Sequence, residues 1–360
     1  MDTTDYKKDE RLEWLRFVLN PSQPMPAVKD WRSLLDFANK QAIAGVCEPT
    51  RFDEARPDRD VLFEWIGLTA QLRERNTLMN KLAVRLVQKL GGDGFRCCIL
   101  KGQGNATMYP DEALRTPGDI DVWVDAEEKE LLAYVKELFP EENETHKHIK
   151  FPVFRQTEVD MHYTPLKLYH PGNNKRLQLW LQDNKERQMT HLIRLSGTEQ
   201  DIAIPTAMFN VVYQMGHILI HVEDEGIGLR QLVDYYYVLR EVARLSDEEK
   251  RDIVTVWEQF GMKKFARAVM WVEHALLGLS EEYLLEAPHE KMGRLLAEDI
   301  LEGGNFGHHS SRQGYWRYGR YAKKCADAWH LARISACFPS EAMFRLISKM
   351  GTAGRMMMGK

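Results

Sequence analysis

Hydrophobic residues recur every three or four positions over most of the chain, which is the spacing of α-helices. Before residue 93 this pattern predicts a helix that ends at Pro21, a second that begins after Asp30, and a third over about 59–90. Asp30 is the type of side chain that caps a helix N-terminus, and Gly91 stops the third helix. The same spacing returns from about residue 177, with helices expected at 206–222, 229–245, 247–260, 262–278, 289–301 and 314–335.

Residues 94–165 differ, because short apolar runs alternate there with glycine, proline and acidic residues. Short runs that are rich in β-branched residues and bounded by turn residues are typical of strands. Strands are expected at 96–101, 120–124, 146–154 and 157–163, the last two as a hairpin, with short helices near 103–109 and 127–139. The sequence therefore predicts an α+β fold with a small mixed β-sheet, N-terminal helices and a C-terminal all-helical region.

The change of pattern also suggests how the chain is divided. We expect residues 1–92 to form an N-terminal helical region that packs on the core. Residues 93–176 would form the α/β core, and residues 177–360 a C-terminal helical domain.

Composition and charge narrow the class of protein. Hydrophobic residues make up 44% and charged residues 28%, as in ordinary globular domains. The formal charge of −4 gives no general attraction to long nucleic acid, so we do not expect it as a partner. The five cysteines lack the spacing of a zinc site, and no apolar segment reaches the roughly 20 residues that a membrane span needs. The N-terminus also has no apolar signal core, so we expect a cytoplasmic protein with no membrane partner.

Two aspartates lie on the predicted strand at 120–124 or directly before it. Side chains two positions apart on a strand face the same side, so Asp119 and Asp121 project together after the uncrowded backbone of Gly118. Asp160, on a later predicted strand, is placed to join them if the two strands pair. Carboxylate oxygens are the ligands that Mg²⁺ prefers, and three of them can support displacement at a phosphate. An Asp-x-Asp pair alone is also common in turns and at strand ends, so the surrounding motifs matter.

Those motifs occur in a fixed order: Leu100-Lys101-Gly102, Tyr109-Pro110, Arg115 and Gly118-Asp119-Ile120-Asp121. In this order they resemble the polymerase-β-type nucleotidyltransferase superfamily, and more closely the bacterial uncharacterised nucleotidyltransferase family. The resemblance extends over about residues 30–335 and implies a nucleotidyltransferase core for the predicted sheet.

The resemblance implies transfer of a nucleoside monophosphate from a nucleoside triphosphate to an unknown small-molecule or protein acceptor. Asp119, Asp121 and Asp160 would be the catalytic residues and the ligands of Mg²⁺ or Mn²⁺.

The resemblance also implies a nucleotide-binding set of Lys101, Gly102, Gln103, Arg115 and Gly118. Lys101 would contact phosphate, or would be a surface lysine at a strand end. Arg115 would reach a phosphate, or would pair with an acidic residue of its own loop. The superfamily usually has Gly or Ser after the first glycine of its motif, and Gln103 departs from this.

Two other functions remain open. The departure at Gln103 favours a catalytically weak or inactive nucleotide-binding protein with a regulatory or antitoxin-like role. The Asp-x-Asp pair also occurs in glycosyltransferases, but these expect a strand–helix unit of roughly 100 residues ahead of the pair. This chain has predicted helices there instead.

The sequence favours structural roles for the histidines. His162 shares a strand face with Asp160 and could orient it, but we interpret it as a half-exposed strand histidine. His217 and His221 share a face of an apolar helix and are interpreted as packing residues, and Asp234 as an ion-pair partner of Arg230.

Overall fold

The computed structural model describes residues 6, 8–141, 148–307, 309, 318 and 320–357. By its internal contacts the chain divides into two compact units. One comprises Met1–Cys47, Leu168–Arg176 and Gln214–Lys360, and the other comprises Glu48–Lys167 and Leu177–Tyr213. The predicted site residues all belong to the second unit, which contains the sheet.

The sheet has four strands in the order β1 (Cys97–Ile99), β2 (Ile120–Val124), β4 (Val159–His162) and β3 (Ile149–Lys150). β1 and β2 are antiparallel, β2 and β4 are parallel, and β3 is antiparallel to β4. A parallel pair needs a crossover between its strands, and α6 (Glu128–Leu138) lies in the segment that joins β2 to β4. The predicted mixed sheet, and the pairing of the Asp160 strand with the Asp121 strand, are confirmed.

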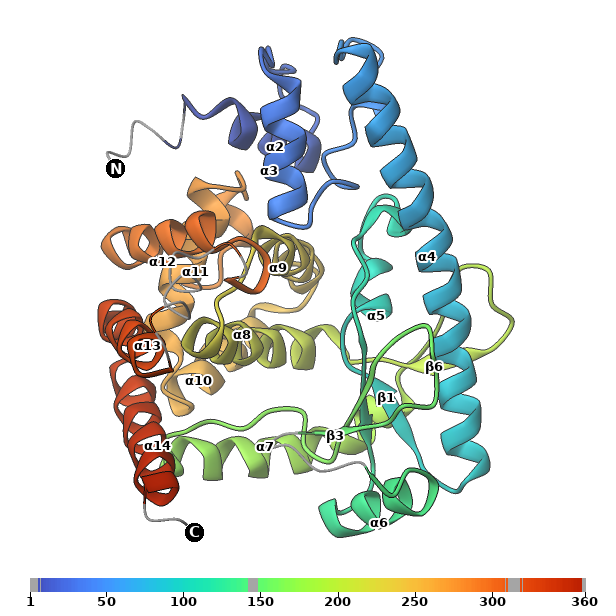
Figure 1. The fold of residues 1–360 in the computed structure, drawn as a ribbon, viewed down its shortest axis with the longest axis vertical. Coiled ribbons are helices and arrows are strands. Elements are labelled where there is room, and N and C mark those ends of the chain that lie inside the picture. The colour runs from blue at the N-terminus through green and yellow to red at the C-terminus, as the bar shows by residue number, and fades with distance from the viewer. Residues whose placement is uncertain are drawn as a thin grey trace. The chain divides into compact units, whose positions relative to one another are not determined.

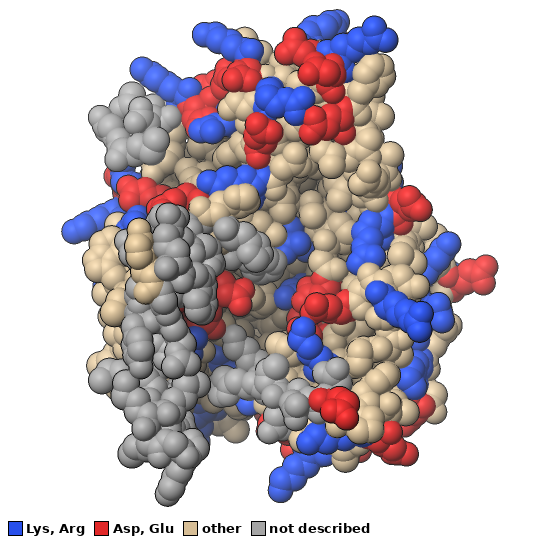
Figure 2. Space-filling view, viewed as in Figure 1, with Lys and Arg blue, Asp and Glu red and all other residues tan. Residues whose placement is uncertain are grey.

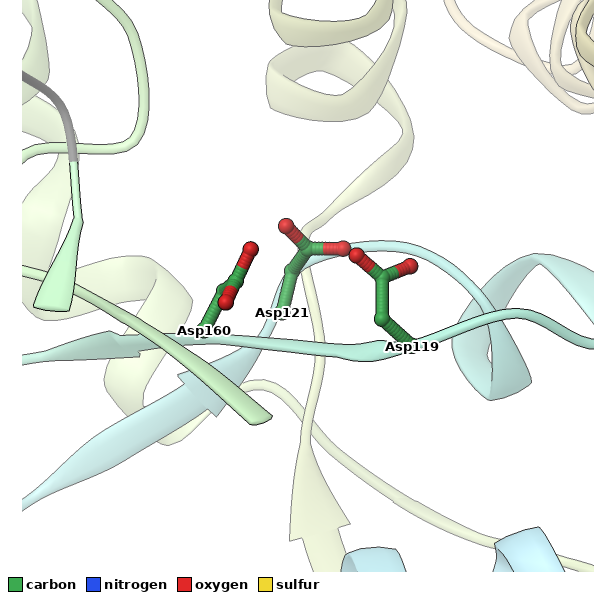
Figure 3. Close-up of side chains that lie close together, drawn as sticks. All are labelled: Asp119, Asp121 and Asp160. Atoms are coloured by element: carbon green, nitrogen blue, oxygen red, sulfur yellow. The ribbon is translucent and has the colours of Figure 1, made fainter. Parts of the chain in front are cut away.

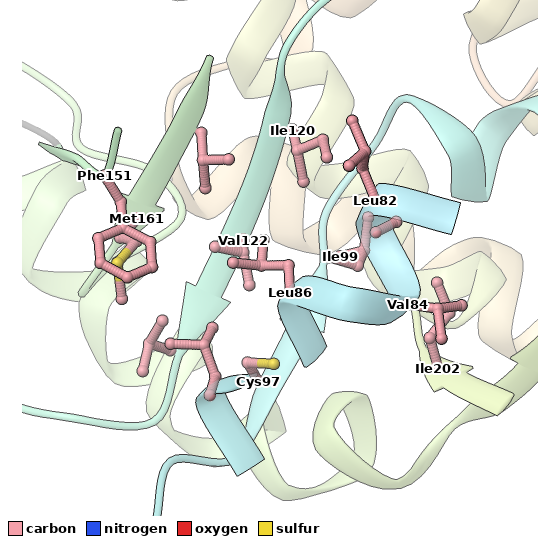
Figure 4. Close-up of a cluster of buried hydrophobic side chains, with 14 of the residues drawn as sticks. Leu82, Val84, Leu86, Cys97, Ile99, Ile120, Val122, Phe151, Met161 and Ile202 are labelled. Carbon is pink, nitrogen blue, oxygen red and sulfur yellow. The ribbon is translucent and has the colours of Figure 1, made fainter. Parts of the chain in front are cut away.

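Strand alternation assigns the two faces of the sheet. Ile120, Val122 and Val124 of β2 lie in one buried apolar cluster, together with Val159 and Met161 of β4. The long helix α4 (Arg59–Gly92) packs on this face, and its Leu82 and Leu86 are part of the cluster (Figures 1 and 4). The intervening residues of β2 and β4 therefore face the opposite side of the sheet.

The opposite face is covered in part by aromatic residues of later helices. The ring of Trp123 on β2 stacks on Phe209 at 5.7 Å, and Phe209 stacks on Trp180 at 5.0 Å. Phe209 belongs to α8 (Ala207–Asp224) and Trp180 to α7 (Pro171–Thr190). Aromatic side chains thus cover this face at Trp123, and Asp121 and Asp160 lie side by side on the same face.

Most predicted elements of the second unit match the structure. β2 has the predicted bounds, α4 ends at Gly92, and α6 lies within 127–139. The helix after β1 is shorter than expected, since α5 covers Gln103–Ala106. Positions 146–147 of the predicted third strand lie outside the described residues.

The prediction that the chain is wholly helical from residue 177 is wrong at one place. β5 (Leu192–Arg194) and β6 (Asp201–Ala203) form a two-stranded antiparallel sheet that is joined through Gly197 at a positive φ of 69°. Each strand has three residues, too few for a period-two pattern to stand out. α7 also begins earlier than expected, with Pro171 in its first turn, where proline costs no hydrogen bond.

The first unit is built from helices. Its α-helices are α2 (Glu10–Leu19), α3 (Trp31–Lys40), α9 (Leu229–Val242), α10 (Asp247–Gln259), α11 (Lys263–Ala275), α12 (Glu290–Gly303), α13 (Arg320–Ile334) and α14 (Pro339–Met357), with the start of α7 and the second half of α8. Asp30 caps α3 as predicted, because its side chain accepts from the amide of Ser33. Of the last predicted helix, 314–317 and 319 lie outside the described residues. No helix in the described part of the chain is long and apolar enough to cross a membrane.

Candidate metal and nucleotide site

Three aspartates converge on the sheet face opposite α4. Asp119 directly precedes β2, Asp121 lies on β2, and Asp160 lies on β4, where the parallel register places it beside Asp121. One carboxylate oxygen from each lies within 4.8 Å of the others, and Asp119 is the most exposed of the three. Figure 3 shows the three carboxylates side by side and pointing to the same side of the sheet.

The donor set fits a hard divalent cation. All three ligands are carboxylate oxygens, which suit Mg²⁺ and Mn²⁺. Burial raises the pKa of Asp160 to about 6, and the charges of Asp121 and Asp119 add to this effect. Its Oδ1 is buried with no hydrogen-bond partner among the described residues. A cation at this place would relieve both the repulsion and the unsatisfied oxygen.

Both oxygens of the Asp121 carboxylate lie against side chains of neighbouring strand segments. The Lys101 ammonium lies 2.9 Å from Oδ2, and His162 Nε2 lies 2.9 Å from Oδ1. A carboxylate can only accept, so His162 donates through Nε2. The interpretation of His162 as a half-exposed strand histidine is wrong: the residue is 6% exposed and contacts Asp121 rather than Asp160.

Asp160 has a histidine neighbour of its own. His148 Nε2, just before β3, lies 3.3 Å from Asp160 Oδ2. The rings of His148 and His162 are 5.4 Å apart. An imidazole therefore lies beside each of the two strand-borne aspartates, as is common for ligands whose orientation is fixed by a second layer of polar groups.

The turn after β1 requires glycine. Gly102 has φ 62° and ψ −109°, a conformation that residues with a Cβ rarely adopt. A Cβ built on Gly102 would meet only the carbonyl oxygen of Asp119, at an ordinary 3.7 Å, so the requirement is conformational. The turn ends β1 with Lys101 beside Asp121 and starts α5.

The side chain of Gln103 is buried against α4. Its amide nitrogen donates to the side-chain oxygens of Asn80 and, at 3.4 Å, Asn76. Asn76 in turn donates to the carbonyls of Ala113 and Arg115, each at 2.8 Å. The two asparagines of α4 thus hold both the α5 turn and the loop that leads to Asp119.

Arg115 and Gly118 lie in that loop. Arg115 is 4% exposed, and its guanidinium donates to the carbonyl of Thr116 at 3.4 Å. Asp111, an acidic residue of the segment before Arg115, forms an ion pair with Arg73 at 2.7 Å. The carbonyl of Gly118 accepts from the Thr157 hydroxyl at 3.5 Å, which ties the loop to the segment before β4.

Sequence reasoning did not find His148, Asn76 or Asn80. Asn76 and Asn80 are four residues apart on a helix and both buried, so two amides at that spacing among apolar positions were a usable signal. His148 gave no such signal, because its contact with Asp160 depends on the β3–β4 pairing.

His217 and His221 lie in the first unit. His217 and His221 on α8 are half-buried, with ring centroids 4.3 Å apart, and His221 lies 3.9 Å from Glu225. Asp234 on α9 is buried. Both histidine contacts join residues four positions apart in sequence, so they are local to this segment of the chain.

Charge is mixed on the molecular surface. Figure 2 shows acidic and basic side chains interspersed over the described part of one face. This agrees with the near balance of 49 Lys and Arg residues against 53 Asp and Glu residues.

Residues 27–278 match the protein family described as "Uncharacterised nucleotidyltransferase". Among solved structures, an antigenic nucleotidyltransferase-like protein from Paracoccidioides brasiliensis matches with 13% identity and a TM-score of 0.35, over 59% of this chain and 94% of that chain. No curated protein matches the chain. The family match includes every residue of the aspartate site, from Asn76 on α4 to His162 on β4.

Proposed function

The chain belongs to the uncharacterised nucleotidyltransferase family, and from this premise we propose that it transfers a nucleoside monophosphate from a nucleoside triphosphate to an acceptor hydroxyl or phosphate. Membership of the family implies a nucleoside triphosphate substrate and transferase chemistry. The observation that carries the proposal is the convergence of Asp119, Asp121 and Asp160 on one face of a mixed sheet.

The three aspartates would hold Mg²⁺ or Mn²⁺ together with the triphosphate. A bound cation would activate the α-phosphate as a Lewis acid and compensate the charge of the leaving pyrophosphate. Asp160 would accept the proton of the acceptor hydroxyl, a role that suits a carboxylate beside the two aspartates that would hold the cation. The acceptor oxygen bonds to the α-phosphorus while the bond to the β-phosphate oxygen breaks, and pyrophosphate leaves.

The turn after β1 provides the phosphate side of the proposed site. Lys101 and the backbone near Gly102 would orient the β- and γ-phosphates. Arg115 and Gly118, in the loop that leads to Asp119, would complete the nucleotide-binding set. Gln103 retains a side-chain oxygen, while its nitrogen donates to α4.

The acceptor is proposed only as a class. The balanced surface charge supports a small molecule or a protein over long nucleic acid. A glycosyltransferase role is disfavoured, since the described residues ahead of β1 form only helices and turns.

Nucleotide binding is tested first. Isothermal titration with ATP, GTP, CTP and UTP in the presence of Mg²⁺ is expected to show binding of at least one. Absence of binding by all four in a folded sample contradicts the proposal.

Turnover is tested by pyrophosphate release with the nucleotide that binds. Asp119→Asn, Asp121→Asn and Asp160→Asn are each expected to lower the rate by at least about a hundredfold, since each removes a charged ligand. Glu158→Gln is the matched control, because Glu158 directly precedes β4 but is exposed and pairs with Lys150. If the protein binds a nucleotide but releases no pyrophosphate, and the three substitutions leave this binding unchanged, the protein is a non-catalytic nucleotide-binding protein.

A further inference from the structure

Lys101 lies where a cation would be expected. Its ammonium lies 2.9 Å from Asp121 Oδ2, and the two side chains are 18% and 5% exposed. Asp121 is the central member of the three aspartates, between Asp119 along its own chain segment and Asp160 on the paired strand. A lysine held this deeply on a proposed metal ligand is more than a surface lysine at a strand end.

A divalent cation and this ammonium compete for one oxygen. His162 donates to Oδ1, and a cation that Asp121 ligates through Oδ2 would meet the ammonium directly. Carboxylate oxygens ligate Mg²⁺ at about 2.1 Å, which would bring an ammonium that stayed on Oδ2 within about 4 Å of a doubly charged ion. Such repulsion in a largely buried place favours departure of one of the two cations.

Lys101 is the group that can leave. Its four-carbon side chain is flexible, partly exposed and attached at the end of β1, next to the Gly102 turn. His162 is instead a buried ring on β4 with its Nε2 on Asp121. The contact on Oδ1 can therefore persist while the contact on Oδ2 is exchanged.

We propose that Lys101 is a stand-in cation for the site. Its ammonium neutralises Asp121 when no divalent cation is bound, leaves Oδ2 when one arrives, and takes the triphosphate as its new partner. This inference rests on the proposed function, and it adds that metal and nucleotide binding are coupled through one side chain. Because such coupling is reciprocal, a nucleotide that holds the displaced Lys101 raises the affinity for the metal, and the metal raises the affinity for the nucleotide.

The first test measures Mn²⁺ alone, by the electron paramagnetic resonance signal of the free ion. Lys101→Met keeps an unbranched side chain, one atom shorter, and removes the competing charge, so it is expected to bind Mn²⁺ about tenfold more tightly than the wild type. Lys150→Met is the matched control: Lys150 also lies near Asp160 but pairs with the exposed Glu158. As a screened surface charge it is expected to change the affinity by no more than about threefold.

The second test uses the wild-type protein and does not depend on a variant that folds. Lysines are acylated briefly with an amine-reactive reagent, with and without saturating Mn²⁺, and quantified by peptide mass spectrometry. Departure of the ammonium from Asp121 is expected to increase acylation of Lys101 several-fold, while acylation of Lys150 stays constant.

The outcomes separate the two proposals. The stand-in role is overturned if Lys101→Met binds Mn²⁺ no more tightly than the wild type, or if Mn²⁺ leaves the acylation of Lys101 unchanged. In either case the metal site itself stands, provided that Asp121→Asn abolishes Mn²⁺ binding. If the wild type, Lys101→Met and Asp121→Asn all fail to bind Mn²⁺, the metal site of the proposed function fails, and the stand-in role with it.

Discussion

His162 and Lys101 contact opposite oxygens of Asp121 and are expected to have opposite effects on metal affinity. The imidazole fixes the orientation of the carboxylate from the buried side, 2.9 Å from Oδ1. Such second-layer partners typically contribute about 10- to 100-fold to metal affinity. His162→Phe, which keeps an aromatic ring but loses the donor, should therefore weaken Mn²⁺ binding by about tenfold or more in the same titration.

His191→Phe is the matched control for this prediction. His191 lies in the same unit, and its Nδ1 contacts the carbonyl of Ile204 rather than an aspartate. If the two variants change the affinity for Mn²⁺ equally, His162 has no specific role in orienting Asp121.

The raised pKa of Asp160 predicts how stability depends on pH in the metal-free protein. Burial and the neighbouring carboxylates raise this pKa from 3.8 to about 6, so the folded state binds the proton more tightly than the unfolded state. Ionisation of Asp160 therefore destabilises the folded protein. This loss of stability is absent below pH 3.8, grows as the pH rises, and is complete above about pH 6. At about 1.4 kcal/mol per pH unit it approaches about 3 kcal/mol at neutral pH.

Asp160→Asn removes this titration. In urea unfolding with EDTA, the variant should gain on the wild type in free energy of unfolding by up to about 3 kcal/mol at pH 7.5, and by much less at pH 4.5. Glu158→Gln should show no comparable change between the two pH values, because the side chain of Glu158 is 71% exposed. An Asp160→Asn gain that is the same at both pH values would place the cause outside this carboxyl group.

At the scale of elements, β2 and β4 were predictable because the alternation of apolar and polar residues in their sequences matches the buried and functional faces of the sheet. The β-branched run Ile120–Val124 follows Pro117-Gly118, and its alternation places apolar residues toward α4 and Asp121 on the other face. The same alternation in β4 places Asp160 and His162 together. Three carboxylates on one face therefore follow from period-two spacing once the two strands pair.

The contacts between elements could not be predicted in the same way. The approach of Lys101 to Asp121 depends on antiparallel pairing of β1 with β2, and that of His148 to Asp160 on the pairing of β3 with β4. The β5–β6 hairpin was missed because three-residue strands with an exposed Leu192 resemble a helix end. Gln103 was considered only for phosphate, since its spacing gave no hint of the asparagines on α4.

At the scale of the whole molecule, the electrostatic field at the site comes from nearby carboxylates and not from the net charge of the chain. The formal charge of −4 is spread over 360 residues, whereas three carboxylates share a few ångströms at the sheet. The family match over 27–278 includes parts of both compact units, so the family's sequence pattern extends beyond the sheet. Affinity for a small divalent cation, as proposed, would thus be set by the site and not by the net charge.

Metal binding should accordingly appear as stabilisation of the folded protein. A ligand that binds only the native state at 100 times its Kd contributes about 2.7 kcal/mol. For a domain of 150–250 residues this raises the melting temperature by roughly 5–10 °C. Differential scanning calorimetry with Mn²⁺ against EDTA should show this rise for the wild type and none for the Asp119→Asn/Asp121→Asn variant. A rise of the same size in both proteins would show that Mn²⁺ acts elsewhere, because the variant lacks two of the three carboxylate ligands.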